Sequence, residues 1–165
     1  MKNMLSDRSY AAPMLALRLA IGWRFLFEAL VKLYNPGWSA KGYLLSSEGW
    51  FSFFFHWLAG NETLLRAVDF LNTFGLLFVG LGLLLGLFYK AATITGLVLL
   101  SLYYLAHPPI LSNSGIPAEG NYFLVDNVLI LTVAMWALLK FRTNLTYGLD
   151  GYILSKKGER ISQTA

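Results

Sequence analysis

Four long apolar stretches dominate the pattern of hydrophobic and polar positions along this chain. They cover about residues 13–34, 67–89, 91–107 and 121–139. About 20 helical residues are needed to cross the hydrocarbon layer of a bilayer. The stretches are continuously apolar and do not alternate, which is typical of helices and not of barrel strands. The pattern therefore predicts an all-α integral membrane four-helix bundle, with residues 1–165 as a single membrane domain.

The segment between the first and second stretches has a different character. Residues 41–60 read KGYLLSSEGWFSFFFHWLAG, which is rich in aromatic residues but too short and too polar to cross a membrane. Tryptophan and tyrosine favour the membrane–water interface. The segment therefore predicts an interfacial helix, which either packs on the bundle as a lid or helps to admit a lipid-like ligand.

The composition narrows the class of protein. Charged residues make up 13% of the chain and hydrophobic residues 56%, with a mean hydropathy of +0.55. Soluble domains carry about 25% charged residues. We therefore do not expect a water-soluble enzyme, a disordered tail or a nucleic-acid-binding module. The chain has no cysteine, so it has no thiolate metal site and no disulfide.

The basic residues predict the orientation of the four spans, because lysine and arginine are enriched on the cytoplasmic side of a membrane. One side holds Lys2, Arg8, Lys90, Lys140, Arg142, Lys156, Lys157 and Arg160. The other side holds Lys41 and Arg66, with Lys32 at a span end. We therefore expect a multi-pass protein of the inner (cytoplasmic) membrane with both termini cytoplasmic. The basic tail, residues 140–165, is expected to rest on anionic headgroups.

Four charged residues interrupt the first apolar stretch: Arg18, Arg24, Glu28 and Lys32. At about 100° per residue, all four fall within an arc of about 120° on one helix face. A charge inside a bilayer is costly, so it needs a partner or a function. The stripe is therefore expected to face the interior of the bundle.

Polar residues near the ends of the other spans are candidates to face this stripe. With the orientation above, they lie in the outer half of the membrane, at the level of Glu28 and Lys32. They are Arg66, Asp69, Asn72, Tyr103, Tyr104, His107 and Asp126. Their expected depth in the membrane alone predicts the ion pairs Arg24–Asp126, Glu28–Arg66 and Lys32–Asp69.

Two interpretations of this cluster stay open. In the first, the polar groups only tie the helices together, as buried polar residues do in membranes. In the second, they line a polar pocket in which Arg24, Arg66 and His107 hold an anion or a quinone carbonyl. Tyr103, Tyr104 and Trp57 would then flank a flat ring.

Other features predict no further chemistry. His56 and His107 show no metal-ligand spacing, and no glycine-rich loop suits a phosphate, so neither a metal site nor a nucleotide site is expected. Gly75, Gly82 and Gly86 share one face of the second span. This face predicts close helix packing, with a homo-oligomer seam as the alternative.

Several motifs resemble the DoxX/DoxD family of four-helix membrane proteins. The first span carries Arg18-x3-Gly22-x2-Phe25-x-Phe27-x4-Lys32. The stretches WSAKGYL from Trp38 and LYYLAHPP from Leu102 look more like the DoxD branch, which includes the membrane subunit of thiosulfate:quinone oxidoreductase. The resemblance covers about residues 14–139.

This resemblance implies a bundle that works with the quinone pool, often beside a second redox subunit, here on the outer face. It implies that a functional pocket is lined by Arg18, Arg24, Glu28, Lys32, Asp69 and Asn72. Within it, Arg24 and Lys32 are expected to hold a quinone oxygen or an anionic donor, and Glu28 and Asp126 to relay protons. The alternatives are a non-catalytic membrane scaffold that docks a partner and, in third place, a small-solute transporter.

Overall fold

The computed structural model describes residues 8–109, 121–122, 125–141, 143 and 147–164. Its helices are α1 (Arg8–Tyr34), α2 (Lys41–Leu45), α3 (Ser52–Gly60), α4 (Glu62–Leu85), α5 (Tyr89–Ala106), α6 (Asn127–Lys140) and α7 (Leu149–Thr164). Two short strands, β1 (Asn121–Tyr122) and β2 (Val125–Asp126), pair antiparallel before α6. The prediction of a mostly helical protein is confirmed.

Two of the helices are long and apolar enough to cross a membrane. They are α4 and α5, whose most apolar windows have mean hydropathies of 1.9 and 1.3. The helix α6 is apolar but has only 14 residues. At about 1.5 Å per residue it is shorter than the hydrocarbon layer. The predicted fourth span, 121–139, is therefore wrong at its start, where Asn121–Tyr122 and Val125–Asp126 form strands.

The second span begins and ends away from the predicted positions for local reasons. Asn61 is the N-cap of α4, and its Oδ1 atom accepts hydrogen bonds from the amides of Thr63 and Leu64 at 3.0 and 3.2 Å. Such a cap satisfies amides that have no partner in the first helical turn. The helix ends because Gly86 takes the left-handed conformation, with φ 62°. Lys90, predicted to separate the two spans, lies inside α5 instead.

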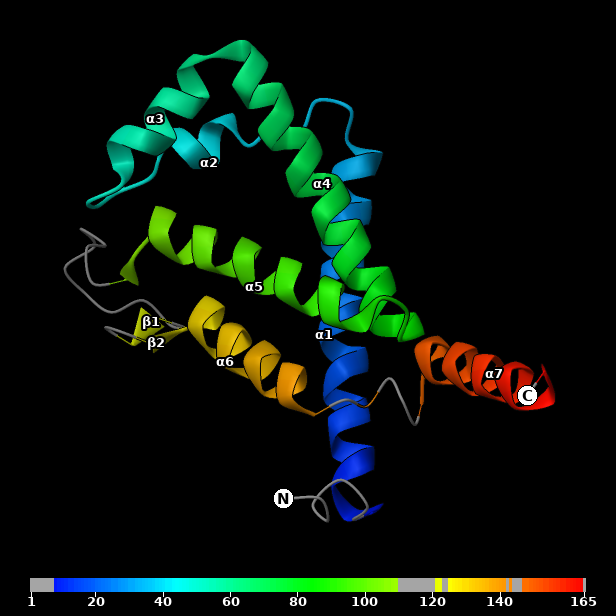
Figure 1. Ribbon diagram of the computed structural model, residues 1–165. Helices are drawn as coiled ribbons and strands as arrows, with labels where there is room; N and C mark the ends of the chain where they lie inside the picture. Colours follow the sequence, from blue (N-terminus) through cyan, green and yellow to red (C-terminus); the bar gives the residue numbers. More distant parts are fainter. Residues whose placement is uncertain (1–7, 110–120, 123–124, 142, 144–146, 165) are drawn as a thin grey trace.

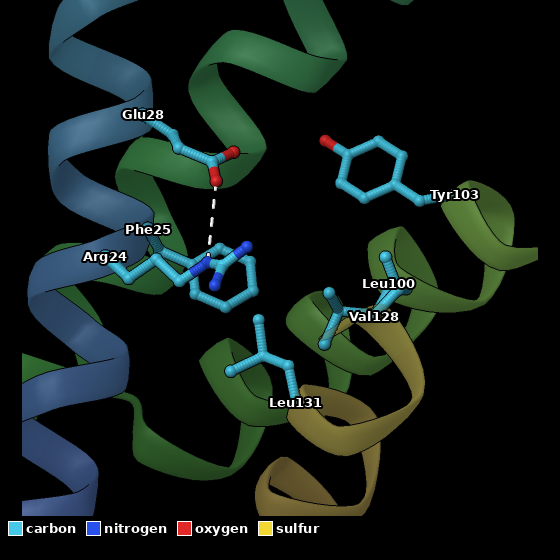
Figure 2. Close-up of a pocket in the computed structure, with 7 residues that line it drawn as sticks. All are labelled: Arg24, Phe25, Glu28, Leu100, Tyr103, Val128 and Leu131. Carbon is cyan, nitrogen blue, oxygen red and sulfur yellow. Dashed lines mark ion pairs between the residues drawn. The ribbon is translucent and has the colours of Figure 1, made fainter. Parts of the chain in front are cut away.

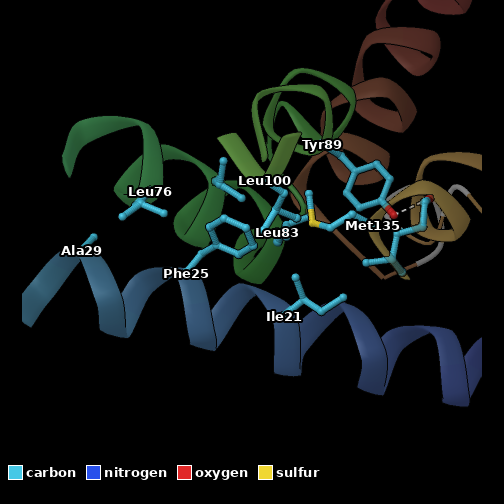
Figure 3. Packing of buried hydrophobic residues seen from close by; sticks show 10 residues of the cluster. Ile21, Phe25, Ala29, Leu76, Leu83, Tyr89, Leu100 and Met135 are labelled. Carbon is cyan, nitrogen blue, oxygen red and sulfur yellow. Dashed lines mark hydrogen bonds between the residues drawn. The ribbon is translucent and has the colours of Figure 1, made fainter. Parts of the chain in front are cut away.

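The main core lies where α1, α4, α5 and α6 meet. In Figure 1, α4 crosses α1, while α5 and α6 run side by side. Figure 3 shows side chains of α1 pointing at those of α4 and α5, with Met135 of α6 beside them. The fully buried members include Ala29, Leu76, Leu83 and Met135.

Glycines allow the closest helix approaches in this core. A Cβ atom on Gly80 of α4 would lie 2.6 Å from the backbone nitrogen of Leu26 on α1. On the predicted glycine face, a Cβ on Gly82 would lie 2.5 Å from Cβ of Ala92 on α5. The glycine face of α4 therefore packs within the chain, against α5.

The aromatic segment between α1 and α4 is helical, as predicted, and it forms two short helices, α2 and α3. Phe55 and Ala59 of α3 pack with Ala40 and Leu44 in a second, smaller cluster. The other side of the segment is exposed and aromatic. Its exposed residues are Trp50, Phe51, Phe53, Phe54 and Trp57.

Candidate functional site

A small pocket opens between α1, α5 and α6. Its walls are mostly apolar, and its polar groups come from Arg24 and Glu28 of α1 and Tyr103 of α5. Figure 2 shows these three side chains turned toward one another. The apolar walls are Phe25, Leu100, Val128 and Leu131. The enclosed space is about 40 Å³, which is room for about three water molecules.

The charged pair of the pocket is formed within α1. Nε of Arg24 lies 3.6 Å from Oε1 of Glu28, one helical turn away. The two side chains are 51% and 43% exposed, so both can change rotamer. The predicted pairs Arg24–Asp126 and Glu28–Arg66 are wrong, because residues one turn apart on a helix are nearer than residues matched only by depth.

A hydrogen-bonded group adjoins the pocket through Tyr103. The Tyr103 hydroxyl donates to Oδ1 of Asn72 on α4 at 3.2 Å, and the Lys32 ammonium donates to the same oxygen at 2.8 Å. The ammonium also lies 4.6 Å from the ring centroid of Trp38, where a cation–π attraction operates. Lys32 is therefore held by Asn72 and Trp38, and the predicted pair Lys32–Asp69 is wrong.

A second polar group caps this end of α5. The ring of Tyr43 lies 4.3 Å from that of His107, and Nε2 of His107 lies 3.1 Å from the Ser46 hydroxyl. The Tyr43 hydroxyl donates to the Tyr103 carbonyl at 3.2 Å. Burial, together with the smaller effect of the negative charge of Asp126, raises the pKa of Tyr43 to about 12.

Asp69 and Asp126 bind backbone amides. Oδ1 of Asp69 accepts from the Ala40 amide at 2.7 Å, which ties the entry of α2 to α4. Asp126 is the N-cap of α6, where its Oδ1 accepts from the Leu129 amide at 2.8 Å. Both carboxylates therefore have structural partners at the pocket end of the molecule.

Arg18 does not join the other charges of the stripe. It is 2% exposed. Its guanidinium donates to the Thr143 hydroxyl at 3.2 Å and to the Tyr147 carbonyl at 2.6 Å. These partners follow α6, at the end of the molecule opposite the pocket. The expectation that Arg18 lines the pocket is therefore corrected: a shared helix face does not give a shared depth, and Arg18 lies almost two turns before Arg24.

Three further candidates lie outside the pocket lining. Arg66 is highly exposed and pairs with Glu62, 3.7 Å away on the same helix. Trp57 is 54% exposed on α3. Tyr104 is partly buried near the end of α5. None of the three faces Arg24 across the pocket.

Sequence reasoning missed the roles of Tyr43 and Trp38 beside the site. Tyr43 lies in the segment 41–60, which is predicted to be interfacial because of its residue types, and Trp38 precedes that segment. No local pattern links Tyr43 to His107 or Trp38 to Lys32, since each contact joins separate elements. The apolar walls carry no sequence signal that separates them from ordinary core residues.

Comparison with known proteins adds no assignment. No family model, curated protein or solved structure matches this chain. Within the described ranges, no group of three or more histidine, aspartate or glutamate side chains is placed to hold a metal ion.

Proposed function

We propose that this chain is an integral membrane subunit of a redox system and binds a quinone at the Arg24–Glu28–Tyr103 pocket. The observation that carries the proposal is a charged pair placed in the middle of a long helix and facing an apolar pocket. Charges at such positions in membrane helices usually serve a function. The motifs that resemble the DoxX/DoxD family point the same way.

In this proposal α1, α4, α5 and α6 are the four spans, with α5 and α6 strongly inclined to α1 (Figure 1). The pocket end collects the C-terminal halves of α1 and α5 and the N-terminal halves of α4 and α6, through Glu28, Tyr103, Asn72 and Val128. With α4 and α5 crossing the inner membrane, α1 and α6 cross beside them. The short α6 is accommodated by local thinning of the bilayer. The basic residues then place both termini in the cytoplasm and the pocket in the outer half.

The residues of the pocket fit a quinone head group. A quinone presents two carbonyl acceptors on a flat, apolar ring, and the pocket offers the Arg24 guanidinium as a donor, with the Tyr103 ring among its walls. The Tyr103 hydroxyl keeps its hydrogen bond to Asn72. The enclosed 40 Å³ is smaller than such a ring, so entry requires the half-exposed Arg24 side chain to swing outward.

In this proposal each polar residue has a separate role. A bound quinone supplies a two-electron, two-proton acceptor. Arg24 orients one carbonyl oxygen by a charge-assisted hydrogen bond. Glu28, beside Arg24, receives and delivers protons at its carboxylate oxygens. Asn72, whose Oδ1 also accepts from Lys32, holds the Tyr103 hydroxyl in place. A redox partner on the outer face supplies the electrons.

Direct binding tests the proposal. The protein is purified in detergent, its bound lipids are extracted, and a quinone analogue is titrated into the protein in nanodiscs. We expect saturable binding that is weakened about 10- to 100-fold by Arg24→Gln, the effect of losing a hydrogen bond from a charged group. Arg66→Gln is the matched control, since it breaks an equivalent pair with Glu62 away from the pocket. Absence of both co-purified quinone and saturable binding would end the proposal.

A second function, a non-catalytic scaffold that docks a partner, is favoured by one observation. Lys32, Asn72 and Tyr103 satisfy one another, as helix-tying groups do. Replacing Arg24 and Glu28 together with glutamine separates the two functions. The scaffold predicts a misfolded protein, whereas the quinone site predicts a folded protein that no longer binds the analogue.

A further inference from the structure

The last helix, α7, is fastened to the turn between α4 and α5 by one aspartate. Oδ1 and Oδ2 of Asp150 accept hydrogen bonds from the amides of Phe88 and Tyr89 at 3.0 and 3.1 Å. The Asp150 amide donates to the Gly86 carbonyl at 3.0 Å. The carboxylate thus caps the start of α5 from outside that helix. Figure 1 shows α7 leaving this turn away from the other helices.

A second attachment lies just before α7. The buried guanidinium of Arg18 holds the Tyr147 carbonyl and the Thr143 hydroxyl. Two bonded points on either side of residue 148 set where α7 starts. Because α4 ends and α5 begins at this turn, α7 starts at a membrane surface when these two helices cross the bilayer.

The first turns of α7 leave an apolar face uncovered. Leu149, Tyr152 and Ile153 are 43%, 65% and 51% exposed. At about 100° per residue, these three and Lys156 fall within an arc of about 100°, and exposed Leu154 lies about 100° beyond Ile153. The Lys156 ammonium lies 5.9 Å from the ring centroid of Tyr152. An apolar patch bordered by lysine is typical of a helix lying in a membrane interface, with the lysine stem on the acyl boundary and its charge among headgroups.

The charge at this end of the molecule selects the kind of lipid. Exposed Lys90 and Lys140 lie at the start of α5 and the end of α6, and Lys157, Glu159 and Arg160 follow Lys156 in the sequence, so the basic residues outnumber the acidic ones. The nearby carboxylate of Asp150 is engaged as a helix cap. We propose that α7 is an interfacial helix that binds the anionic phospholipid surface of the membrane crossed by α4 and α5. The proposal depends on these two helices spanning and is independent of quinone binding.

The absence of cysteine from the chain allows a site-specific test on the full-length protein. Ile153→Cys is labelled with an environment-sensitive fluorophore, and the protein is placed in nanodiscs of phosphatidylcholine alone or of an equimolar mixture with phosphatidylglycerol. Ser155→Cys is the matched control, because it lies about 160° away around the same helix. We expect a blue-shifted emission at position 153 in the anionic nanodiscs, reversed by salt, and little change at position 155.

Charge removal completes the test. The double variant Lys156→Gln/Lys157→Gln is expected to weaken the response of the label at position 153 to anionic lipid by about fivefold per lysine. The control Lys41→Gln, at the other end of the molecule, is expected to leave this response unchanged. Identical emission in the two lipid mixtures, or equal shifts at positions 153 and 155, would overturn the proposal. An unaltered response in the double lysine variant would also overturn it.

Discussion

The Lys32 ammonium on α1 and the Tyr103 hydroxyl on α5 share one acceptor, Oδ1 of Asn72 on α4. A single amide oxygen therefore ties three helices together at the pocket end of the molecule. The geometry also positions Tyr103, which lines the pocket. Loss of this oxygen affects two donors at once.

Asn72→Leu is expected to lower the free energy of unfolding by about 1–3 kcal/mol, because it leaves a partly buried ammonium and a partly buried hydroxyl without an acceptor. Unfolding in mixed detergent micelles measures the change. Adding Lys32→Met to this variant should recover part of the loss, since the unpaired charge is then removed. Ser101→Ala, which removes an exposed bond within α5, is the control. Equal stability of Asn72→Leu and wild type would refute the shared-acceptor role.

Gly80→Ala is expected to destabilise the protein by about 1–3 kcal/mol through overpacking. The added methyl group would meet backbone atoms of Leu26, which cannot move without shifting α1. Gly75→Ala on the same helix is the control, because its new methyl group would meet only the flexible end of Leu99, at 3.3 Å. The same unfolding assay compares the two, and an equal effect would contradict this account of the α1–α4 contact.

The Tyr43 hydroxyl is expected to ionise near its raised pKa of about 12. The folded state favours the neutral form of the Tyr43 hydroxyl. The neutral hydroxyl therefore contributes fully to the free energy of unfolding below the ordinary tyrosine pKa of about 10. This contribution is lost as the pH rises toward 12. Ultraviolet difference titration of wild type against Tyr43→Phe isolates this group. A Tyr43 titration at the ordinary value would show that the hydroxyl is not buried beside Asp126.

Substitutions of Asp126 distinguish a role as a helix cap from a role as a proton relay. Asn and Asp cap helices about equally, so Asp126→Asn should keep the stability, whereas Asp126→Ala should lose about 1 kcal/mol. Asp126→Asn should also lower the pKa of Tyr43, since it removes a charge that raises it. Circular dichroism during thermal unfolding measures the first effect. If Asp126→Asn instead abolishes quinone-linked turnover in a folded protein, the relay role holds.

Arg18→Lys tests the buried attachment at the opposite end. An ammonium cannot reproduce the two diverging bonds of the guanidinium to Thr143 and Tyr147. We expect faster amide hydrogen exchange in α7, with a stability loss of about 1–3 kcal/mol. Arg24→Lys, at a half-exposed position, should leave exchange in α7 unchanged. Unaltered exchange in Arg18→Lys would show that this arginine does not hold the segment.

Local sequence signals predicted some features of the site and missed others. Arg24, Glu28 and Tyr103 were among the candidates and meet at one pocket. The ion pairs were wrong because matching depth places many residues at one level and does not say which side chains are neighbours. The predicted place of Arg18 was wrong for a different reason. Arg18 lies on the predicted face of α1 but at a different depth from the pocket.

The sequence by itself determined the helical character, the apolar stretches and the uneven distribution of basic residues. These follow from hydrophobic runs and charges that act locally, whatever the rest of the chain does. Only the tertiary structure decided that Lys32 binds Asn72, that Asp126 caps α6, and that Asp150 caps α5 across 61 residues. A hydrogen bond requires a donor aimed at its acceptor and a separation of about 3 Å between the two atoms. Between segments far apart in the sequence, only the packing of the helices sets this orientation and distance.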